Sequence, residues 1–328
     1  MNKFLRPRHP QRLFSDDRLK ANDSYTFLMK ELEKVDEKIL EPLAGTDWPR
    51  DMPVITGGGL VENIASIDVS YASTGGNEDG LFSDAANDIP VIQADLSKSV
   101  ARVFNFAEYM VFPIIEDEKM RSVGRDPETF LNKGLRLHYD KVVDRNVYVG
   151  FTRVGSSGLV NSALVTRSMV PVGAGGTTTW DTKTADEILK DINLALTAVW
   201  FENDCASDGL PNHILLPVTQ FGSLVTRKVS DDSERSILTY ILENNLVTQQ
   251  GQELVISPVK WCSGRGTNGS DRMVVYANRI DRICFNITQP LRRMDTETAD
   301  LRIKIPYLAQ FSEVRFLYPT TVRYMDGI

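Results

Sequence analysis

The most regular pattern in the sequence is a helical one between residues 126 and 146. Asp126 is a good helix-capping residue, and Pro127 fits the first helical position, where a backbone N–H has no partner within the helix. One stripe of side chains then recurs at steps of three and four residues over about five turns: Phe130, Leu131, Leu135, His138, Val142 and Val143. A Gly/Ser turn follows at 155–158. The spacing therefore predicts a long amphipathic helix followed by a tight turn.

A second pattern, of period two, lies upstream of this helix. Ile67, Val69 and Tyr71 alternate with polar residues, which is typical of a half-buried strand. A glycine-rich polar segment follows at 74–80, and the chain reads as extended again over 89–96 and 100–112. Two extended arms joined by such a tip predict a long hairpin. A hairpin cannot bury both its faces within its own chain, so we expect it to need a neighbour.

The remaining segments give the fold class. Residues 1–20 have no period and read as an extended arm, and a helix is expected over 22–41. Thr184 and Glu187 form a capping box for a helix over 185–203. Further helices are expected near 218–227 and 233–245, and strands at 213–218, 253–262, 273–277, 283–288, 301–311 and 314–324. Helices are concentrated before residue 246 and strands after it, without βαβ alternation, so the predicted class is α+β.

Charge and cysteine content narrow the possible partners. The net charge of −7 argues against a protein that grips nucleic-acid phosphates over its whole surface. Cationic side chains nevertheless crowd the first twenty residues, either as a solvated tail or as an arm that lies on an acidic neighbour: Lys3, Arg6, Arg8, Arg12, Arg18 and Lys20. The three cysteines, Cys205, Cys262 and Cys284, are isolated, which suits a reducing compartment. No apolar run approaches the roughly 18–20 residues of a membrane helix, so no membrane partner is expected.

Motifs that resemble enzyme sites lack the context that their chemistry needs. Gly264, Gly266 and Gly269 match a dinucleotide fingerprint, but a strand follows instead of a helix, so a hairpin loop is the better interpretation. The Gly173–Gly176 segment is not followed by Gly-Lys-Ser/Thr and is no P-loop. His213 has no obvious Ser or Cys partner in sequence. His138, on the helix stripe, is expected to be packed or at an interface rather than catalytic.

Acidic clusters and histidines give no metal pattern. The acidic runs 116–118 and 231–234 are interpreted as solvated turns, because they lack calcium-loop spacing. Three histidines and three scattered cysteines make a Cys/His metal cluster improbable. We therefore predict no catalytic residue, no metal site and no cofactor, and the chain is not expected to be an enzyme. A soluble enzyme that uses the Gly173–Gly176 loop and His213 remains one alternative.

Taken together, the order of segments resembles the tailed-bacteriophage major capsid proteins of the Hong Kong 97-like (Johnson) fold. The resemblance is carried mainly by 126–161, in which a long helix runs into GSSGLVN, similar to the "G-x-x-GLxN"-like turn after the spine helix of that family. The helix 184–203 followed by HILLPVTQFGSL at 213–224 is similar to the family's entry into its axial domain. The resemblance spans roughly residues 22–328.

The resemblance implies a domain layout. Residues 1–50 would be the N-terminal arm and helix, and 51–115 the extended hairpin loop with its base. Residues 116–165 would form the peripheral domain around the spine helix, with return strands at 281–313. Residues 166–280 would form the axial domain, to which the C-terminal strand at 314–328 returns. The segment 290–300 would be a turn of the peripheral domain near local threefold contacts.

The resemblance also implies a function, which is that of a subunit that self-assembles into the icosahedral head shell of a tailed phage and encloses double-stranded DNA. The implied partners are further copies in pentamers and hexamers, cement or scaffolding proteins, a portal, and packaged DNA through non-specific contact. The protein would be made in the bacterial host cytoplasm and reside in the virion. An encapsulin-like compartment shell is a further alternative. The expected subunit-interface residues are Arg6, Arg8, Arg12, Tyr71, Asn77, Glu78, Asp79, Phe82, Arg292 and Arg293.

Overall fold

The computed structural model describes residues 45–328, apart from 75–90, 123, 125 and 231–232. The described residues belong to the second of two compact units, 1–44 and 45–328, into which the chain divides. The predicted arm and the predicted helix at 22–41 lie outside the described residues, and so does most of the predicted hairpin tip.

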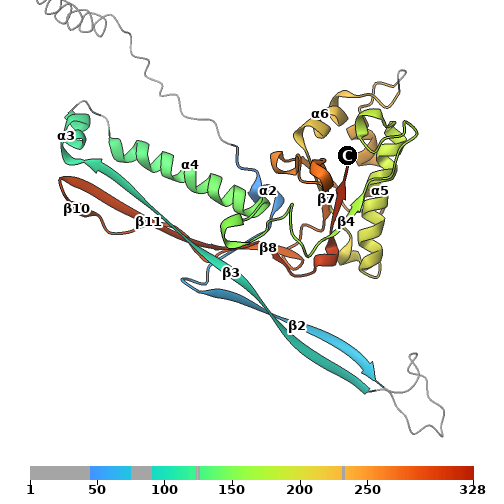
Figure 1. Cartoon of the computed structure of the whole chain (residues 1–328), viewed down its shortest axis with the longest axis horizontal. Helices are drawn as coiled ribbons and strands as arrows, with labels where there is room; N and C mark the ends of the chain where they lie inside the picture. The colour runs from blue at the N-terminus through green and yellow to red at the C-terminus, as the bar shows by residue number, and fades with distance from the viewer. Residues whose placement is uncertain (1–44, 75–90, 123, 125, 231–232) are drawn as a thin grey trace, which may run out of the picture. The chain divides into compact units, whose positions relative to one another are not determined.

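Seven α-helices and six short 3-10 turns lie in the described part of this unit, and Figure 1 labels several of the helices. The α-helices of the described residues are α2 (Trp48–Asp51), α3 (Ile114–Ser122), α4 (Pro127–Tyr148), α5 (Ala185–Glu202), α6 (Val218–Thr226), α7 (Ile237–Asn244) and α8 (Leu246–Gln249). The 3-10 turn η4 spans Lys260–Cys262.

The strands of the described residues form three sheets (Figure 1). Their bounds are β1 (Val54–Thr56), β2 (Asn63–Thr74), β3 (Val91–Pro113), β4 (Thr166–Met169), β5 (His213–Leu216), β6 (Val255–Pro258), β7 (Arg272–Tyr276), β8 (Ile283–Ile287), β9 (Gln289–Arg293), β10 (Glu297–Ala299), β11 (Arg302–Ser312), β12 (Arg315–Phe316) and β13 (Val322–Asp326). The strand orders are β1-β8-β12, β10-β11-β3-β2 with β9 beside β11, and β4-β13-β7-β5-β6. Helices and mixed sheets without βαβ alternation make the fold α+β, as predicted.

The five-stranded sheet β4-β13-β7-β5-β6 is buried on both faces. Along β7, Met273 and Val275 join one core cluster, which includes the inner face of α5, whereas Val274 and Tyr276 join the other, which includes the end of α4. All four side chains are fully buried. The covered strand predicted at 213–218 is β5, and it lies between β7 and β6 in this sheet. The capping box of α5 is present, because Thr184 accepts from the Glu187 N–H and the Glu187 carboxylate accepts from the Thr184 N–H.

Strand β3 connects two regions of the structure. Its first half, from Val91 to Arg102, pairs antiparallel with β2, and its second half, from Val103 to Pro113, pairs antiparallel with β11. The sequence predicted two separate extended segments here, and the structure has one strand of 23 residues. The hairpin of β2 and β3 is confirmed.

Helix α4 begins as predicted, since the Asp126 side chain accepts from the Glu128 N–H. The predicted stripe is partly wrong: Leu131 and His138 are exposed, whereas Tyr139 and Val147 are buried. The buried residues Leu135, Tyr139, Val143 and Val147 are spaced by four, so the covered face is rotated from the predicted one. His138 instead pairs with Glu108 of β3 at 2.9 Å.

The turn after α4 folds back onto the helix end. The N–H groups of Leu159 and Val160 donate to the carbonyls of Val147 and Tyr148 at 2.8 and 3.0 Å. A Cβ at Gly158 would collide with the Tyr148 backbone, so this close approach requires glycine. That steric requirement gives the physical reason for the glycine in the GSSGLVN segment.

Several local predictions are wrong for identifiable reasons. The acidic run 116–118 is part of helix α3, where Asp117 is buried and pairs with Arg121 at 2.9 Å. The segment 290–300 contains strands β9 and β10, which pair with β11, and is not a simple turn. The segment 314–324 is two strands, β12 and β13, separated by a 3-10 turn that starts at Pro319.

The glycine motif at 264–269 is not a hairpin loop. Strands β6 and β7 both pair with β5, on opposite sides, so this segment crosses over β5. The segment 45–62 contains α2 and β1.

Candidate subunit interface

The β2–β3 hairpin has one apolar face and one polar face. In its unbroken register, Ile67 lies opposite Lys98, Val69 opposite Leu96 and Tyr71 opposite Ala94. Because paired residues point to the same side of a sheet, one face collects large apolar side chains, here named the apolar hairpin face: Ile67, Val69, Tyr71, Ile92, Leu96 and Val100. The other face carries Ser66, Asp68, Ser70, Gln93, Asp95, Ser97 and Ser99.

All six side chains of the apolar hairpin face are exposed. Tyr71 and Ile92 are each 76% exposed, and Val69, the least exposed of the six, is still 46% exposed. The strand at 67–71 forms as predicted, but it is not half-buried within its own chain. Full burial of one such side chain is worth roughly 1.5–3 kcal/mol, so six of them together are a large unused driving force for association.

The root of the hairpin is held to the body by buried polar groups. The Gln310 side chain accepts from the Val61 N–H at 3.0 Å and donates to the Val61 carbonyl at 2.8 Å, while Gln310 itself is 5% exposed. Arg102 of β3 donates through its N–H to Glu313 and through its guanidinium to the Val154 carbonyl. These contacts fix where the hairpin starts and leave its apolar face open.

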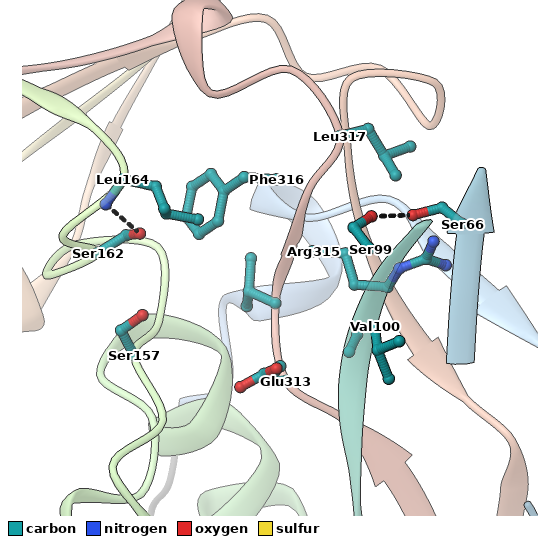
Figure 2. Close-up of a pocket in the computed structure, with 12 residues that line it drawn as sticks. Ser66, Ser99, Val100, Ser157, Ser162, Leu164, Glu313, Arg315, Phe316 and Leu317 are labelled. Carbon is teal, nitrogen blue, oxygen red and sulfur yellow. Dashed lines mark hydrogen bonds between the residues drawn. The ribbon is translucent and has the colours of Figure 1, made fainter. Parts of the chain in front are cut away.

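A pocket of about 190 Å³ lies at this root (Figure 2). It is formed where Ser66 and Ser99 of the hairpin meet the chain around Ser162 and the segment 313–317. The Ser66 and Ser99 hydroxyls are hydrogen-bonded at 2.6 Å, and Figure 2 shows Arg315 beside them. The volume is below the roughly 300–1,000 Å³ of typical small-molecule sites, so the pocket is better understood as part of the junction between hairpin and body.

The chain just after residue 44 is anchored by a buried carboxylate. Asp51 of α2 is fully buried, accepts from the Tyr148 hydroxyl at 2.5 Å and pairs with Arg50 at 2.7 Å. The Tyr276 hydroxyl donates to the Asp51 carbonyl at 2.5 Å. Burial, and then the Asp51 charge, raise the pKa of Tyr148 far above its usual value, so this hydroxyl stays a donor. The network ties α2 to α4 and to the five-stranded sheet.

The predicted interface residues divide into two groups. Tyr71 lies on the apolar hairpin face, and Arg292 and Arg293 are exposed on β9. Arg293 also pairs with Glu128 of α4 at 2.6 Å, within the same chain. The others lie outside the described residues: Arg6, Arg8, Arg12, Asn77, Glu78, Asp79 and Phe82. Sequence reasoning missed Ile92, Leu96 and Val100, although their four-residue spacing places them on one face of a strand.

His213 and the Gly173–Gly176 loop, which the enzyme alternative would use, are held by contacts within the fold. His213 is half-buried in β5, with its Nε2 3.2 Å from the Asn278 amide nitrogen, and burial lowers its pKa. The Gly173 N–H donates to the Thr177 carbonyl, and a Cβ at Gly173 would press on the Lys183 side chain. Within the described ranges, no group of three His, Cys, Asp or Glu side chains could hold a metal ion, and no helix is long and apolar enough to cross a membrane.

Comparison with known proteins decides the family. Residues 78–328, well over half of the chain, match the family described as "Major capsid protein". The chain belongs to the major capsid protein family. A search of curated proteins found no match.

Solved capsid structures share the fold. The capsid of Myoviridae phage XM1 is similar with a TM-score of 0.75 and 16% identity, over 91% of this chain and 98% of that one. A chain of Microbacterium phage Oxtober96 is similar with a TM-score of 0.60 and 11% identity, over 90% of this chain and 95% of that one. The capsid of a native GTA particle is similar with a TM-score of 0.58 and 11% identity, over 90% of this chain and 94% of that one.

The family match and this fold give the capsid protein its role. It has the Hong Kong 97-like fold and, as a major capsid protein, is located in the virion capsid. The encapsulin-like alternative is not favoured by these relatives. The apolar hairpin face is accordingly a candidate contact between copies.

Proposed function

We propose that this capsid protein builds an icosahedral head of pentamers and hexamers around double-stranded DNA, and that the apolar hairpin face is a main contact between neighbouring copies. The observation that carries the proposal is that six large apolar side chains share one exposed face of a hairpin. A two-stranded hairpin has no second layer in its own chain, so a neighbouring subunit supplies the cover. Contacts of this kind, between different patches on identical subunits, close into rings.

The proposal assigns each segment of the chain to a domain of the capsid subunit. The segments 116–165 and 281–313 act as the peripheral domain, and 166–280 with 314–328 act as the axial domain around the fivefold and sixfold axes. Two features support this division: β13 completes the sheet of β4, β7, β5 and β6, and β11 pairs with β3 instead. Residues 1–50 serve as the arm, and 51–115 as the hairpin and its base.

The proposed partners follow from the same role. Scaffolding or cement proteins and a portal complete the head, DNA is held by non-specific contact, and the protein is synthesised in the bacterial host cytoplasm. The protein acts by assembly and carries no enzymatic activity. Arg6, Arg8, Arg12, Asn77, Glu78, Asp79, Phe82, Arg292 and Arg293 are proposed to contact neighbours, together with Tyr71.

The test places the same pair of charges on each face of the hairpin. Val69 and Leu96 are directly opposite on the apolar face, and Ala72 and Gln93 are directly opposite on the polar face. We expect Val69→Lys/Leu96→Glu to abolish closed shells in negative-stain electron microscopy and light scattering. Ala72→Lys/Gln93→Glu should still form shells, because its charges lie on the face that is already polar.

Both variants form an opposite-charge cross-strand pair, so hairpin stability changes little in either. Thermal unfolding of the unassembled subunit checks this, with both midpoints expected near the wild-type value. Closed shells from Val69→Lys/Leu96→Glu, at the wild-type protein concentration, would contradict the proposed role of the apolar hairpin face.

A further inference from the structure

A group of exposed cations surrounds the carboxyl-terminal half of α4. Lys141 and Arg145 are four residues apart, on the side of the helix away from the buried Tyr139 and Val143, and both are exposed. Among the residues that the structure describes, neither has a carboxylate within ion-pair distance. Like charges at this spacing destabilise a helix slightly, a penalty that a polyanion lying across both would remove.

Two further cations, Lys260 and Arg50, are linked to this part of α4 by contacts of η4 and α2. Lys260 of η4 lies 3.4 Å from Asp144, which precedes Arg145 and is one helical turn from Lys141. Arg50 of α2 reaches the Pro258 carbonyl, two residues before Lys260, at 3.5 Å. Helix α2 contacts α4, beside whose carboxyl-terminal end it lies in Figure 1. We name Arg50, Lys141, Arg145 and Lys260 the basic patch.

The carboxylates that pair with the patch are buried beneath it. The Lys260 side chain is 60% exposed and that of Asp144 is 4% exposed, while the Arg50 side chain is 41% exposed and that of Asp51 is fully buried. Asp144 also accepts from the Trp261 indole at 2.9 Å, and Asp51 from the Tyr148 hydroxyl. At these two ion pairs, therefore, the cationic side chain is exposed to solvent and the carboxylate is buried. Asp47, which is exposed and interacts with Arg50, is the counter-charge at the rim.

The patch lacks the apolar centre that protein interfaces usually have. In the described part of the chain, none of the exposed large hydrophobic side chains belongs to α2, to η4 or to residues 138–148. This distinguishes the basic patch from the apolar hairpin face. A surface of exposed cations without apolar anchors suits a polyelectrolyte better than a folded protein partner.

We propose that the basic patch binds the phosphate backbone of duplex DNA without sequence preference. This inference rests on the proposed function, in which the shell encloses DNA. It assigns the contact between shell and DNA to the basic patch. Each phosphate neutralised by a lysine or arginine releases condensed counterions, so binding depends steeply on salt. Although the net charge of the chain is −7, the carboxylates of Asp51 and Asp144 are buried beneath this surface, and Asp47 is the exposed carboxylate that interacts with it.

The experiment measures binding of a fluorescent duplex of about 30 base pairs and arbitrary sequence to the full-length, unassembled protein by anisotropy, over a series of salt concentrations. Lys141→Gln/Arg145→Gln should weaken binding by roughly tenfold or more at about 0.1 M salt, and should reduce the slope of log K against log salt by about 2. The matched control, Lys190→Gln/Lys228→Gln, removes two exposed lysines outside the patch and should leave both quantities unchanged.

Equal binding and equal salt slope for Lys141→Gln/Arg145→Gln and wild type would overturn the proposal, as would an equal loss in the control. A double variant that binds the duplex normally but loses a poly-glutamate peptide would overturn it in favour of an acidic protein partner. Thermal unfolding confirms that these surface variants fold.

Shell formation by the same variants separates this inference from the proposed function. Lys141→Gln/Arg145→Gln should assemble like wild type in electron microscopy, because the apolar hairpin face is unchanged. If wild type forms no shells while the DNA-binding difference holds, the assembly proposal fails and the patch stands. If wild type forms shells but Lys141→Gln/Arg145→Gln binds the duplex as wild type does, the assignment of DNA binding to the basic patch fails and the assembly proposal stands.

Discussion

The β2–β3 hairpin and the five-stranded sheet around β7 contain the same alternating arrangement of side chains but bury them differently. In β7, side chains on both faces are fully buried, because α5 packs on one side and the end of α4 on the other. In the hairpin, Ile67 is 69% exposed and Leu96 is 67% exposed, although they belong to strands as regular as β7. Regular pairing therefore does not imply a covered face.

This difference separates folding from assembly. Side chains in the five-stranded sheet contribute their burial to the stability of the single subunit. Side chains on the apolar hairpin face are exposed in the single subunit, and in the proposed contact they contribute their burial only when a second copy is present, so their effect should appear in association. The same kind of substitution should therefore have opposite consequences in the two regions, and the predictions below test this in order of expected size.

The largest effect is expected at a buried ion pair in the five-stranded sheet. Asp326 of β13 is fully buried and accepts two hydrogen bonds from the Arg272 guanidinium, at 2.6 and 2.8 Å. Asp326→Ala leaves a buried arginine unpaired and should lower the free energy of unfolding by about 3–5 kcal/mol. Denaturant titration of the unassembled subunit measures this. Asp208→Ala, which breaks the exposed pair with Arg279, serves as control and should cost about 1 kcal/mol or less.

The same carboxylate should make stability depend on acid. Burial alone would raise the pKa of Asp326, but the hydrogen bonds from Arg272 and Thr267 outweigh it and lower the pKa below its usual value. A pKa that is lower in the folded state stabilises the fold above the unfolded pKa and loses that contribution as the pH falls through the folded one. Wild type should therefore lose stability below about pH 4, and Asp326→Asn should show a shallower loss. Parallel acid titrations of the two proteins would contradict this.

A pair of isoleucines compares the two regions directly. Ile192 of α5 is fully buried against the sheet, and Ile92 of the hairpin is 76% exposed. Ile192→Ala should destabilise the subunit by about 2–5 kcal/mol through lost burial and a cavity. Ile92→Ala should change subunit stability by no more than about 0.5 kcal/mol, yet raise the protein concentration needed for shell formation. A large loss of subunit stability in Ile92→Ala would show that the hairpin face is covered within its own chain.

A smaller effect is expected at the start of α5. The Thr184 hydroxyl accepts from the Glu187 N–H, and Thr184→Ala removes this cap. We expect a loss of about 1 kcal/mol in the free energy of unfolding, and near-complete retention in Thr184→Ser, which keeps the acceptor. Shell formation should be unaffected by either change, because the cap serves the fold of the subunit.

The smallest effect should be stabilising. Asp300 and Leu301 form the two-residue turn between β10 and β11, with φ of 53° and 56°, and Leu301 is 71% exposed. Positive φ at both positions suits glycine, so Leu301→Gly should stabilise the subunit by roughly 0.5–1 kcal/mol. Ala299→Gly, in the adjoining strand, should instead destabilise it slightly. If Leu301→Gly is neutral for the subunit, the left-handed conformation carries little strain here.

Much of the local structure was predictable because its signals are local. Asp126 and Pro127 start α4, Thr184 and Glu187 start α5, and the alternation at 67–71 gives a strand, since each depends on neighbours a few residues away. The resemblance of the helix and turn at 126–161 to phage capsid proteins led to the right family. The exposed apolar face of the hairpin agrees with the expectation that two strands alone cannot cover both faces, and the need for a neighbour stays a prediction.

What the sequence could not determine depends on which surfaces meet. It placed His138 on the buried stripe of α4, but Tyr139 and Val147 are the buried residues, and His138 is exposed and pairs with Glu108 of β3. It missed that β5 separates β6 from β7, since strand order is a long-range property. The basic patch has the same origin: α2, α4 and η4 are far apart in sequence, and packing joins them where Arg50 and Lys260 pair with the buried carboxylates of Asp51 and Asp144. Local composition sets the shape and faces of each element, whereas tertiary contacts decide which faces are covered and which are left for other molecules.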